Sequence, residues 1–192
     1  MATGPGTSCS FLARLTSPNV PARRFTLLAV WAKADRPHPY VEGVLKAVDV
    51  YADILADGPS VLVGDTNSNA IWDHQHRADR SHSALVRRLN GLGLVSAYHA
   101  HHDEEHGHES TPTCYFRWNK AAPFHLDYCF ISTAWRTQLG GVTVGTFAGW
   151  RRHSDHRPLL VEVASRRRGG VADQQPARLR RPTNPSHSGE LE

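Results

Sequence analysis

Three short segments, far apart in the chain, each place acidic and nitrogen-bearing side chains beside an apolar run. The segments are Val61-Leu62-Val63-Gly64-Asp65-Thr66-Asn67, His125-Leu126-Asp127-Tyr128-Cys129-Phe130 and Ser154-Asp155-His156-Arg157-Pro158-Leu159-Leu160. Each apolar run has the length of a buried strand, so a fold that joins the strands would gather three carboxylates, an amide and an imidazole. These groups together suit the metal-assisted hydrolysis of a phosphate ester.

Each motif alone also has a structural explanation. Gly-Asp-x-Asn is a common turn, because Asp and Asn bond their own backbone and tolerate left-handed conformations. A single Asp in a strand usually faces solvent, and Ser-Asp-His before a strand is compatible with a simple turn. Their joint occurrence, each joined to a strand, favours a shared site.

The order and residue patterns of the three segments resemble the motifs of the endonuclease/exonuclease/phosphatase superfamily. Its members carry Gly-Asp-x-Asn after one strand, an apolar-Asp-Tyr pattern in a second, and Ser-Asp-His before the last. The resemblance implies a mixed α/β fold, the DNase-like four-layer αββα sandwich. It also implies Mg²⁺ or Mn²⁺ as the cofactor and a phosphoester, such as one in nucleic acid, as the substrate.

The resemblance covers residues 25–163 and leaves out two family features. The strand that ends in a metal-site Asn and the strand that ends in a metal-binding Glu are not recognisable here. We therefore expect an incomplete sandwich, truncated at the N-terminal half, with mainly the C-terminal half present. In addition, Trp31 stands where many members have a His, and Lys33 or His38 is the nearest substitute.

The resemblance implies a role for each of five residues. Asp65 would orient or deprotonate the attacking water and share the metal with Asp155, while Asn67 would hold the water or a phosphate oxygen. His156 would donate to the scissile phosphate. Asp127 would accept a hydrogen bond from His156, fixing its tautomer and raising its pKa. An unpaired carboxylate between Leu126 and Tyr128 would be costly, which independently predicts a buried partner for Asp127.

Several elements are expected to position these residues. Residues 25–31 read as a strand, and the apolar period from Val41 to Leu55 predicts a helix that ends at Gly58-Pro59. A second helix is predicted over Ser81 to Asn90. Residues 111–118 and the Asp-Tyr strand are expected to form a hairpin, and 141–147 and 159–163 to be the last two strands.

The segment from Tyr98 to Ser110 carries five His residues among Asp and Glu. Their spacing is irregular, so we interpret the segment as a solvated surface loop. Adventitious binding of Zn or Ni is the alternative.

Length and composition favour one domain with a tail. A chain of 192 residues with 40% apolar content is long enough to bury a core. We expect an irregular segment over 1–24, the partial family domain over 25–165, and a basic disordered tail over 166–192. The net charge is +4, and six Arg against three acidic residues place most of it in that tail, where it would suit a polyanion.

No apolar run approaches the ~18 residues that a membrane span needs, and no secretory signal is seen, so a cytoplasmic location is expected. The three Cys show no metal-type or disulfide-type spacing. Cys129 is expected in the core.

The leading hypothesis is a Mg²⁺-dependent or Mn²⁺-dependent phosphodiesterase of nuclease type. One alternative is a catalytically impaired remnant that serves as a binding module, with an oligomer or partner chain covering the missing half. The other is a phosphomonoesterase or lipid phosphodiesterase on the same fold.

Overall fold

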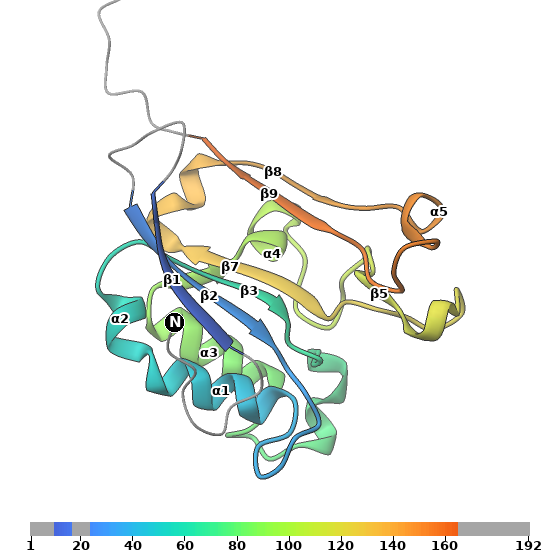
Figure 1. The fold of residues 1–192 in the computed structure, drawn as a ribbon, viewed down its shortest axis with the longest axis horizontal. Coiled ribbons are helices and arrows are strands. Elements are labelled where there is room, and N and C mark those ends of the chain that lie inside the picture. The colour runs from blue at the N-terminus through green and yellow to red at the C-terminus, as the bar shows by residue number, and fades with distance from the viewer. Residues whose placement is uncertain (1–9, 17–23, 165–192) are drawn as a thin grey trace, which may run out of the picture.

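The central element of the computed structural model is a five-stranded sheet with the order β1-β2-β3-β7-β4 (Figure 1). The structure describes residues 10–16 and 24–164. The sheet strands are β1 Ser10–Thr16, β2 Arg24–Trp31, β3 Ser60–Asp65, β4 Leu94–Ser96 and β7 Asp127–Ser132. Strands β2 and β3 are parallel, and the other neighbours are antiparallel.

The other elements are α1 Val41–Val50, α2 Ala52–Ala56, η1 Ala70–Gln75, α3 His82–Gly91, α4 Ala97–His102, β5 Cys114–Tyr115, η2 Phe116–Trp118, β6 Pro123–Phe124, η3 Thr133–Gln138, β8 Leu139–Val144, α5 Phe147–Trp150 and β9 Leu159–Val163.

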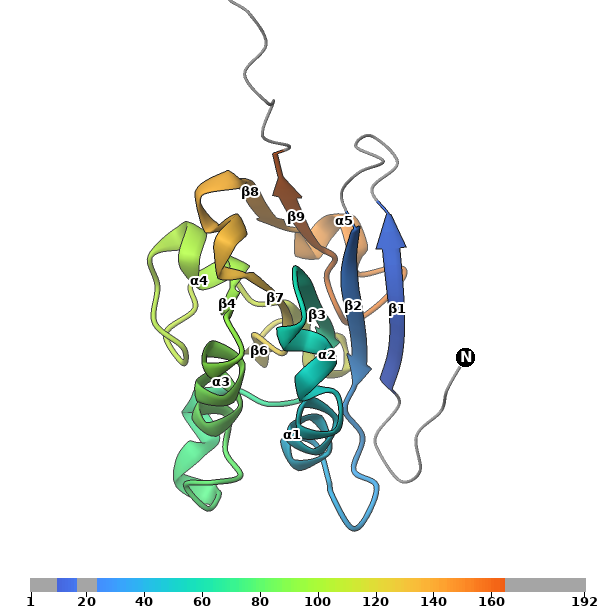
Figure 2. The same cartoon turned by 90° about the vertical axis from the view of Figure 1, so that its left-hand side faces the viewer.

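Helices α1, α2 and α3 cover one face of this sheet (Figures 1 and 2). The predicted helix from Val41 to Leu55 is present, but it is divided at Tyr51 into α1 and α2. Helix α3 begins after Ser81, whose hydroxyl accepts a hydrogen bond from the Ala84 N–H at 3.2 Å. Ser81 therefore caps the N-terminus of the helix that the sequence predicted.

The main core lies between these helices and the sheet. Because strand side chains alternate between faces, every second residue of β2 and β3 points toward the helices. The buried members are Leu28, Val30, Ala32, Val41, Val44, Val48, Leu55, Leu62, Leu85, Leu89, Leu94, Tyr128 and Phe130. At roughly 1.5–3 kcal/mol per large apolar side chain, their burial is the main force that holds the helical layer to the sheet.

The hairpin β8–β9 lies over the opposite face of the sheet (Figure 1). The described residues thus form helix, sheet and hairpin layers, which are part of an αββα sandwich. The predicted last strands are present, although Phe147 begins α5 instead of ending β8. Cys129 is buried on this side of the sheet, as predicted.

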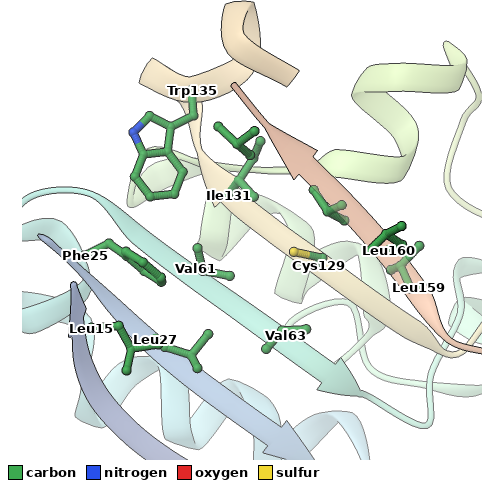
Figure 3. A pocket seen from close by; sticks show the side chains of 12 residues that line it. Leu15, Phe25, Leu27, Val61, Val63, Cys129, Ile131, Trp135, Leu159 and Leu160 are labelled. Carbon is green, nitrogen blue, oxygen red and sulfur yellow. The ribbon is translucent and has the colours of Figure 1, made fainter. Parts of the chain in front are cut away.

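An apolar groove of about 450 Å³ separates the hairpin from β1 and β2 (Figure 3). Leu15, Phe25 and Leu27 line it from the edge of the sheet, and Leu159 and Leu160 from the hairpin. Leu160 is 59% exposed. In the described part of the chain, this face is only partly covered.

Three expectations about local structure were wrong. Residues 10–16, expected to be irregular, form β1, because the free edge of β2 offers backbone partners from Arg24 to Val30. Of the predicted strand over 111–118 only β5 is extended; it pairs with β6, whereas β7 pairs with β3 and β4. The predicted hairpin with the Asp-Tyr strand is therefore replaced by a shorter one.

The third correction concerns the segment from Tyr98 to Ser110. It is solvated only in part, because Tyr98 is fully buried and the side chains of His99 and Glu109 are 8% and 3% exposed, whereas His101, His102 and His108 are exposed. Its polar groups bond one another and the sheet, which makes their burial tolerable.

The predicted tail over 166–192 lies outside the described residues. Within the part of the chain that is described, no helix has both the length and the apolar character to cross a membrane.

Candidate active site

Strand register brings the first two motifs together at one edge of the sheet. Asp65, at the end of β3, lies directly opposite Asp127, at the start of β7, and beside Trp31 of β2. His156 reaches the same place because it forms an isolated bridge with Cys114 of β5. Ligand atoms of Asp65, Asp127 and His156 all lie within 4.8 Å of one another. These three predicted side chains therefore meet here.

Gly64 allows β3 to lie this close to β2. Its φ is +135°, and a Cβ at this position would run into the carbonyl oxygen of Val30. Only glycine combines that backbone angle with that approach. The glycine of the Gly-Asp-x-Asn motif is thus required by the packing that places Asp65.

Asn67 donates a hydrogen bond to each oxygen of the Asp65 carboxylate. Its backbone N–H donates to Asp65 Oδ1 at 2.8 Å, and its amide nitrogen donates to Asp65 Oδ2 at 2.9 Å. The same amide nitrogen donates to the Ala32 carbonyl at 2.8 Å, which ties the turn to the end of β2. In this structure Asn67 therefore orients Asp65, and its predicted contact with water or phosphate stays a prediction.

Asp127 and His156 form the hydrogen bond that the sequence predicted. His156 Nδ1 lies 2.8 Å from Asp127 Oδ2. This bond, followed by the contact with Cys114, raises the pKa of His156 to about 11. The imidazole therefore carries its proton throughout the physiological range and presents a cation at the sheet edge.

The pKa of Asp65 is raised as well, but for a carboxyl group this disfavours the charged form. Burial, and then the negative charge of Asp127, raise the pKa of Asp65 to about 6. A divalent cation would relieve this repulsion, and the oxygen donors present suit a hard cation such as Mg²⁺. The residues at this edge thus fit the divalent cation that the resemblance implies.

Asp155 lies outside the group formed by Asp65, Asp127 and His156. Its carboxylate accepts a hydrogen bond from the Arg117 N–H at 3.2 Å, so it faces the β5–β6 turn. Asp155 is not one of the three residues grouped within 4.8 Å, although its charge contributes to the raised pKa of Asp65. Its predicted part in metal binding remains a prediction.

Sequence reasoning missed two residues that hold the motifs in place. Thr113 Oγ1 accepts from the backbone N–H groups of Leu126 and Asp127, at 2.9 and 3.0 Å. Arg157 is 3% exposed, and its Nη1 donates to the carbonyls of Ser154 and His156, each at 2.8 Å. The position of Arg157 directly after Ser-Asp-His was the only available signal.

Basic and aromatic side chains line a hollow near β5 and α5. Lys120, Arg151 and Arg152 line a hollow of about 570 Å³ together with Phe147 and Ala148. Strand β5 and helix α5 lie beyond the same end of the sheet as the ends of β2 and β3 (Figure 1). This end of the molecule is therefore suited to an anion.

Trp31 is 55% exposed, and Lys33 Nζ lies 4.3 Å from the centre of its ring. Lys33, which the sequence offered as a substitute for the missing His, is thus held against the indole beside Asp65.

Replacing Asp127 by asparagine is expected to lower both raised pKa values. His156 would lose its main partner and move from about 11 toward its ordinary value near 6.5, and Asp65 would lose its negative neighbour. Since the pKa of His156 is raised in the folded state, the stability it contributes is complete below pH 6.5 and is lost as the pH rises through 11. NMR titration of the imidazole and carboxyl groups measures both changes. An unchanged His156 titration in Asp127→Asn would contradict this account.

No family model matches the sequence, and no curated protein matches it. Solved structures do match. The 3′ phosphatase NExo from Neisseria, bound to a product DNA hairpin, is 18% identical with a TM-score of 0.52, over 80% of this chain and 65% of that chain. An AP endonuclease from Archaeoglobus fulgidus is 16% identical with a TM-score of 0.56, over 80% and 65%. An endonuclease/exonuclease/phosphatase from Beutenbergia cavernae DSM 12333 is 15% identical with a TM-score of 0.56, over 78% and 37%.

These likenesses establish the fold. The chain has the DNase-like α/β fold of endonuclease/exonuclease/phosphatase proteins, as the motifs predicted. It spans 65% of the length of both the NExo structure and the Archaeoglobus enzyme.

Proposed function

We propose that this protein is a phosphoester hydrolase that depends on Mg²⁺ or Mn²⁺ and acts as a nuclease-type phosphodiesterase. The observation that carries the proposal is the group formed by Asp65, Asp127 and His156, whose ligand atoms lie within 4.8 Å of one another at the sheet edge. A base, a protonated donor and a supporting carboxylate are what hydrolysis of a phosphoester requires. The fold shared with the DNA-bound NExo structure supports the same conclusion.

In this proposal each residue of the site has a separate role in the reaction. His156, protonated because of Asp127, donates to an oxygen of the scissile phosphoryl group and stabilises the charge that grows there. Asp65 orients the attacking water and accepts its proton, and a pKa of about 6 keeps it ionised at neutral pH yet basic enough for this task. Asn67 fixes the direction of the Asp65 carboxylate.

The proposed cation would be held by Asp65 and Asp155, with Asp127 close by. When bound, it would neutralise charge on the phosphoryl oxygens. Few carboxylates contribute, so we expect weak binding that needs millimolar metal, since affinity depends on the number of charged oxygen ligands.

Nucleic acid is the proposed substrate class because a basic hollow and exposed rings lie together. Arg151 and Arg152 suit phosphates that flank the scissile one. Trp118 and Trp150 are 55% and 43% exposed, and they belong to the turn and the helix beside that hollow. Exposed rings of this kind stack on unpaired bases.

A substrate panel tests the proposal. Plasmid DNA, single-stranded DNA, RNA, a chromogenic diester and a chromogenic monoester would be incubated with Mg²⁺, Mn²⁺ or EDTA. We expect metal-dependent cleavage of nucleic acid that is abolished by EDTA and by Asp65→Asn, while the exposed Asp79→Asn serves as the matched control. Cleavage of the monoester alone would move the assignment to a phosphomonoesterase, and a phospholipid added to the panel separates the lipid phosphodiesterase.

A second candidate is a binding module without catalysis, favoured by the partly covered apolar groove between β1, β2 and β9. Folded protein that binds single-stranded DNA but cleaves nothing in any metal would support it against the hydrolase. An oligomer or partner chain over this groove stays a prediction, as does the cytoplasmic location.

A further inference from the structure

A second group of possible metal ligands lies outside the candidate active site. Ligand atoms of His99, His106 and Glu109 lie within 4.8 Å of one another, and the side chains of His99 and Glu109 are almost completely buried. The hydrolase proposal assigns no role to them. Two imidazole nitrogens and one carboxylate oxygen are ligands that Zn²⁺ prefers, whereas Mg²⁺ and Ca²⁺ prefer oxygen alone.

Local structure holds the three side chains together. Helix α4 provides His99, and the turn that follows it returns the chain so that the rings of His99 and His106 stack with centroids 3.5 Å apart. Gly107, with φ +92°, makes that return possible, and its N–H donates to Glu109 Oε2 at 3.1 Å. Glu109 Oε1 lies 3.1 Å from His99 Nε2.

Each imidazole is held by its other nitrogen. His99 Nδ1 lies 2.7 Å from Ser96 Oγ, and His106 Nδ1 lies 3.2 Å from His82 Nε2. This leaves Nε2 of both rings for a ligand. Fixing one ring nitrogen while the other faces the metal is the usual arrangement around protein-bound zinc.

The carboxylate is held in the same way. Glu109 Oε2 accepts from Asn69 Nδ2 at 3.0 Å, and Asn69 also bonds Tyr128 Oη, at 3.0 Å. Apart from Gly107, the supporting residues belong to the sheet, to helix α3 and to the turn after β3, and not to the segment that carries the ligands. A metal here would fasten residues 97–110 to the sheet.

An independent observation points to a missing ligand. His125 is 4% exposed, and its Nε2 is buried without a hydrogen-bond partner among the described residues. Its Nδ1 lies 2.8 Å from the Thr111 carbonyl, which can only accept, so Nδ1 carries the proton and Nε2 of the neutral ring has a lone pair. The His125 ring lies 6.1 Å from that of His99. A buried acceptor with no donor is costly, and water on a bound metal would supply the donor.

We propose that His99, His106 and Glu109 form a structural zinc site, distinct from the group at Asp65, with water in the remaining position. The ion stabilises the buried segment between α4 and β5. The site's existence does not depend on the hydrolase assignment.

Metal content of the full chain, produced without an affinity tag, tests the proposal. The protein would be stripped with a chelator, supplied with excess Zn²⁺, desalted against a weak chelator and measured by mass spectrometry. We expect one tightly held zinc per chain. His106→Gln and Glu109→Gln should weaken binding by at least about 10- to 100-fold, which is the cost of losing even an outer partner of a ligand. His101→Gln, on exposed His101 of the same helix, is the matched control and should keep the ion.

Cobalt gives a second readout that does not depend on the variants' stability. Co²⁺ added to the stripped wild type is expected to give the visible absorption bands of a four-coordinate ion, and Zn²⁺ should displace it. Zinc should also raise the melting temperature of the wild type and of His101→Gln, but not of His106→Gln. Folded wild type that keeps no zinc, or retention by both ligand variants equal to that of the wild type, would overturn the site.

Discussion

Replacing His156 by alanine is expected to reduce the rate of phosphoester hydrolysis by about 10²- to 10³-fold. The reason is the charge of the ring. Asp127 holds His156 protonated, with a pKa of about 11, so the substitution removes both a hydrogen-bond donor and a positive charge from the place where the phosphoryl group is proposed to bind. The loss should appear mainly in kcat, because charge grows on the phosphoryl oxygens in the transition state.

The matched control is His153→Ala, in the same loop. His153 is exposed and contacts Trp150 with ring centroids 6.0 Å apart, so its removal leaves the Asp127–His156 pair in place. Initial rates at saturating substrate, with circular dichroism to confirm folding, measure the effect. A rate for His156→Ala within a few-fold of the wild type would remove His156 from the mechanism. An equal loss in His153→Ala would mean that the loop, not the imidazole, is responsible.

The pH dependence of the wild-type rate follows from the same two groups. Asp65 acts as a base only when ionised, so the rate is expected to fall as the pH drops through about 6. His156 acts as a donor only when protonated, so the rate is expected to fall again as the pH rises through about 11. Bound metal would lower the pH at which Asp65 becomes protonated and the rate falls, because it favours the ionised carboxylate.

The candidate site could be predicted largely because its residues follow strands. Asp65 and Asp127 stand at the facing ends of neighbouring strands, and a buried strand is visible in sequence as a short apolar run. That Asp127 needs a partner followed from its apolar neighbours, because an unpaired carboxylate among them is costly. The resemblance to the family, and not the rule of burial, named His156 as that partner.

The parts that sequence did not predict depend on contacts between distant segments. Strand β1 forms because the edge of β2 is free, and nothing in the composition of residues 10–16 states that this edge will be open. The composition of the His-rich segment predicts exposure to solvent. His99 and Glu109 are buried all the same, because they hydrogen-bond each other and their remaining polar atoms bond Ser96 and Asn69. Such mutual satisfaction depends on the fold and is not visible in one sequence.

Asp155 illustrates a further limit. The motif places it beside His156, and the resemblance assigned it to the metal together with Asp65. In the structure its carboxylate accepts a hydrogen bond from the backbone of Arg117, because strand β5 runs beside this segment. A motif gives the order of residues and not the direction of each side chain, so the metal role of Asp155 stays a prediction.

Gly64→Ala is expected to cost more than about 3 kcal/mol of folding stability, the largest effect we predict for a change of one methyl group. Two costs add. A φ of +135° is strained for any residue with a Cβ, and the new methyl group would meet the carbonyl oxygen of Val30, which is backbone and cannot rotate away. Relief requires β3 to move away from β2, which breaks the parallel pairing between Ala29–Val63 and Trp31–Asp65.

Urea unfolding of Gly64→Ala beside Gly91→Ala measures this cost with a matched control. Gly91 ends α3, where an added Cβ has no heavy atom within 4 Å, so alanine there should leave stability unchanged or raise it by up to about 1 kcal/mol. Because small domains are stable by only about 5–15 kcal/mol, Gly64→Ala should move the midpoint far down or prevent folding altogether. A midpoint within the range of Gly91→Ala would mean that β3 can leave β2 at little cost, and the placement of Asp65 opposite Asp127 would then not depend on Gly64.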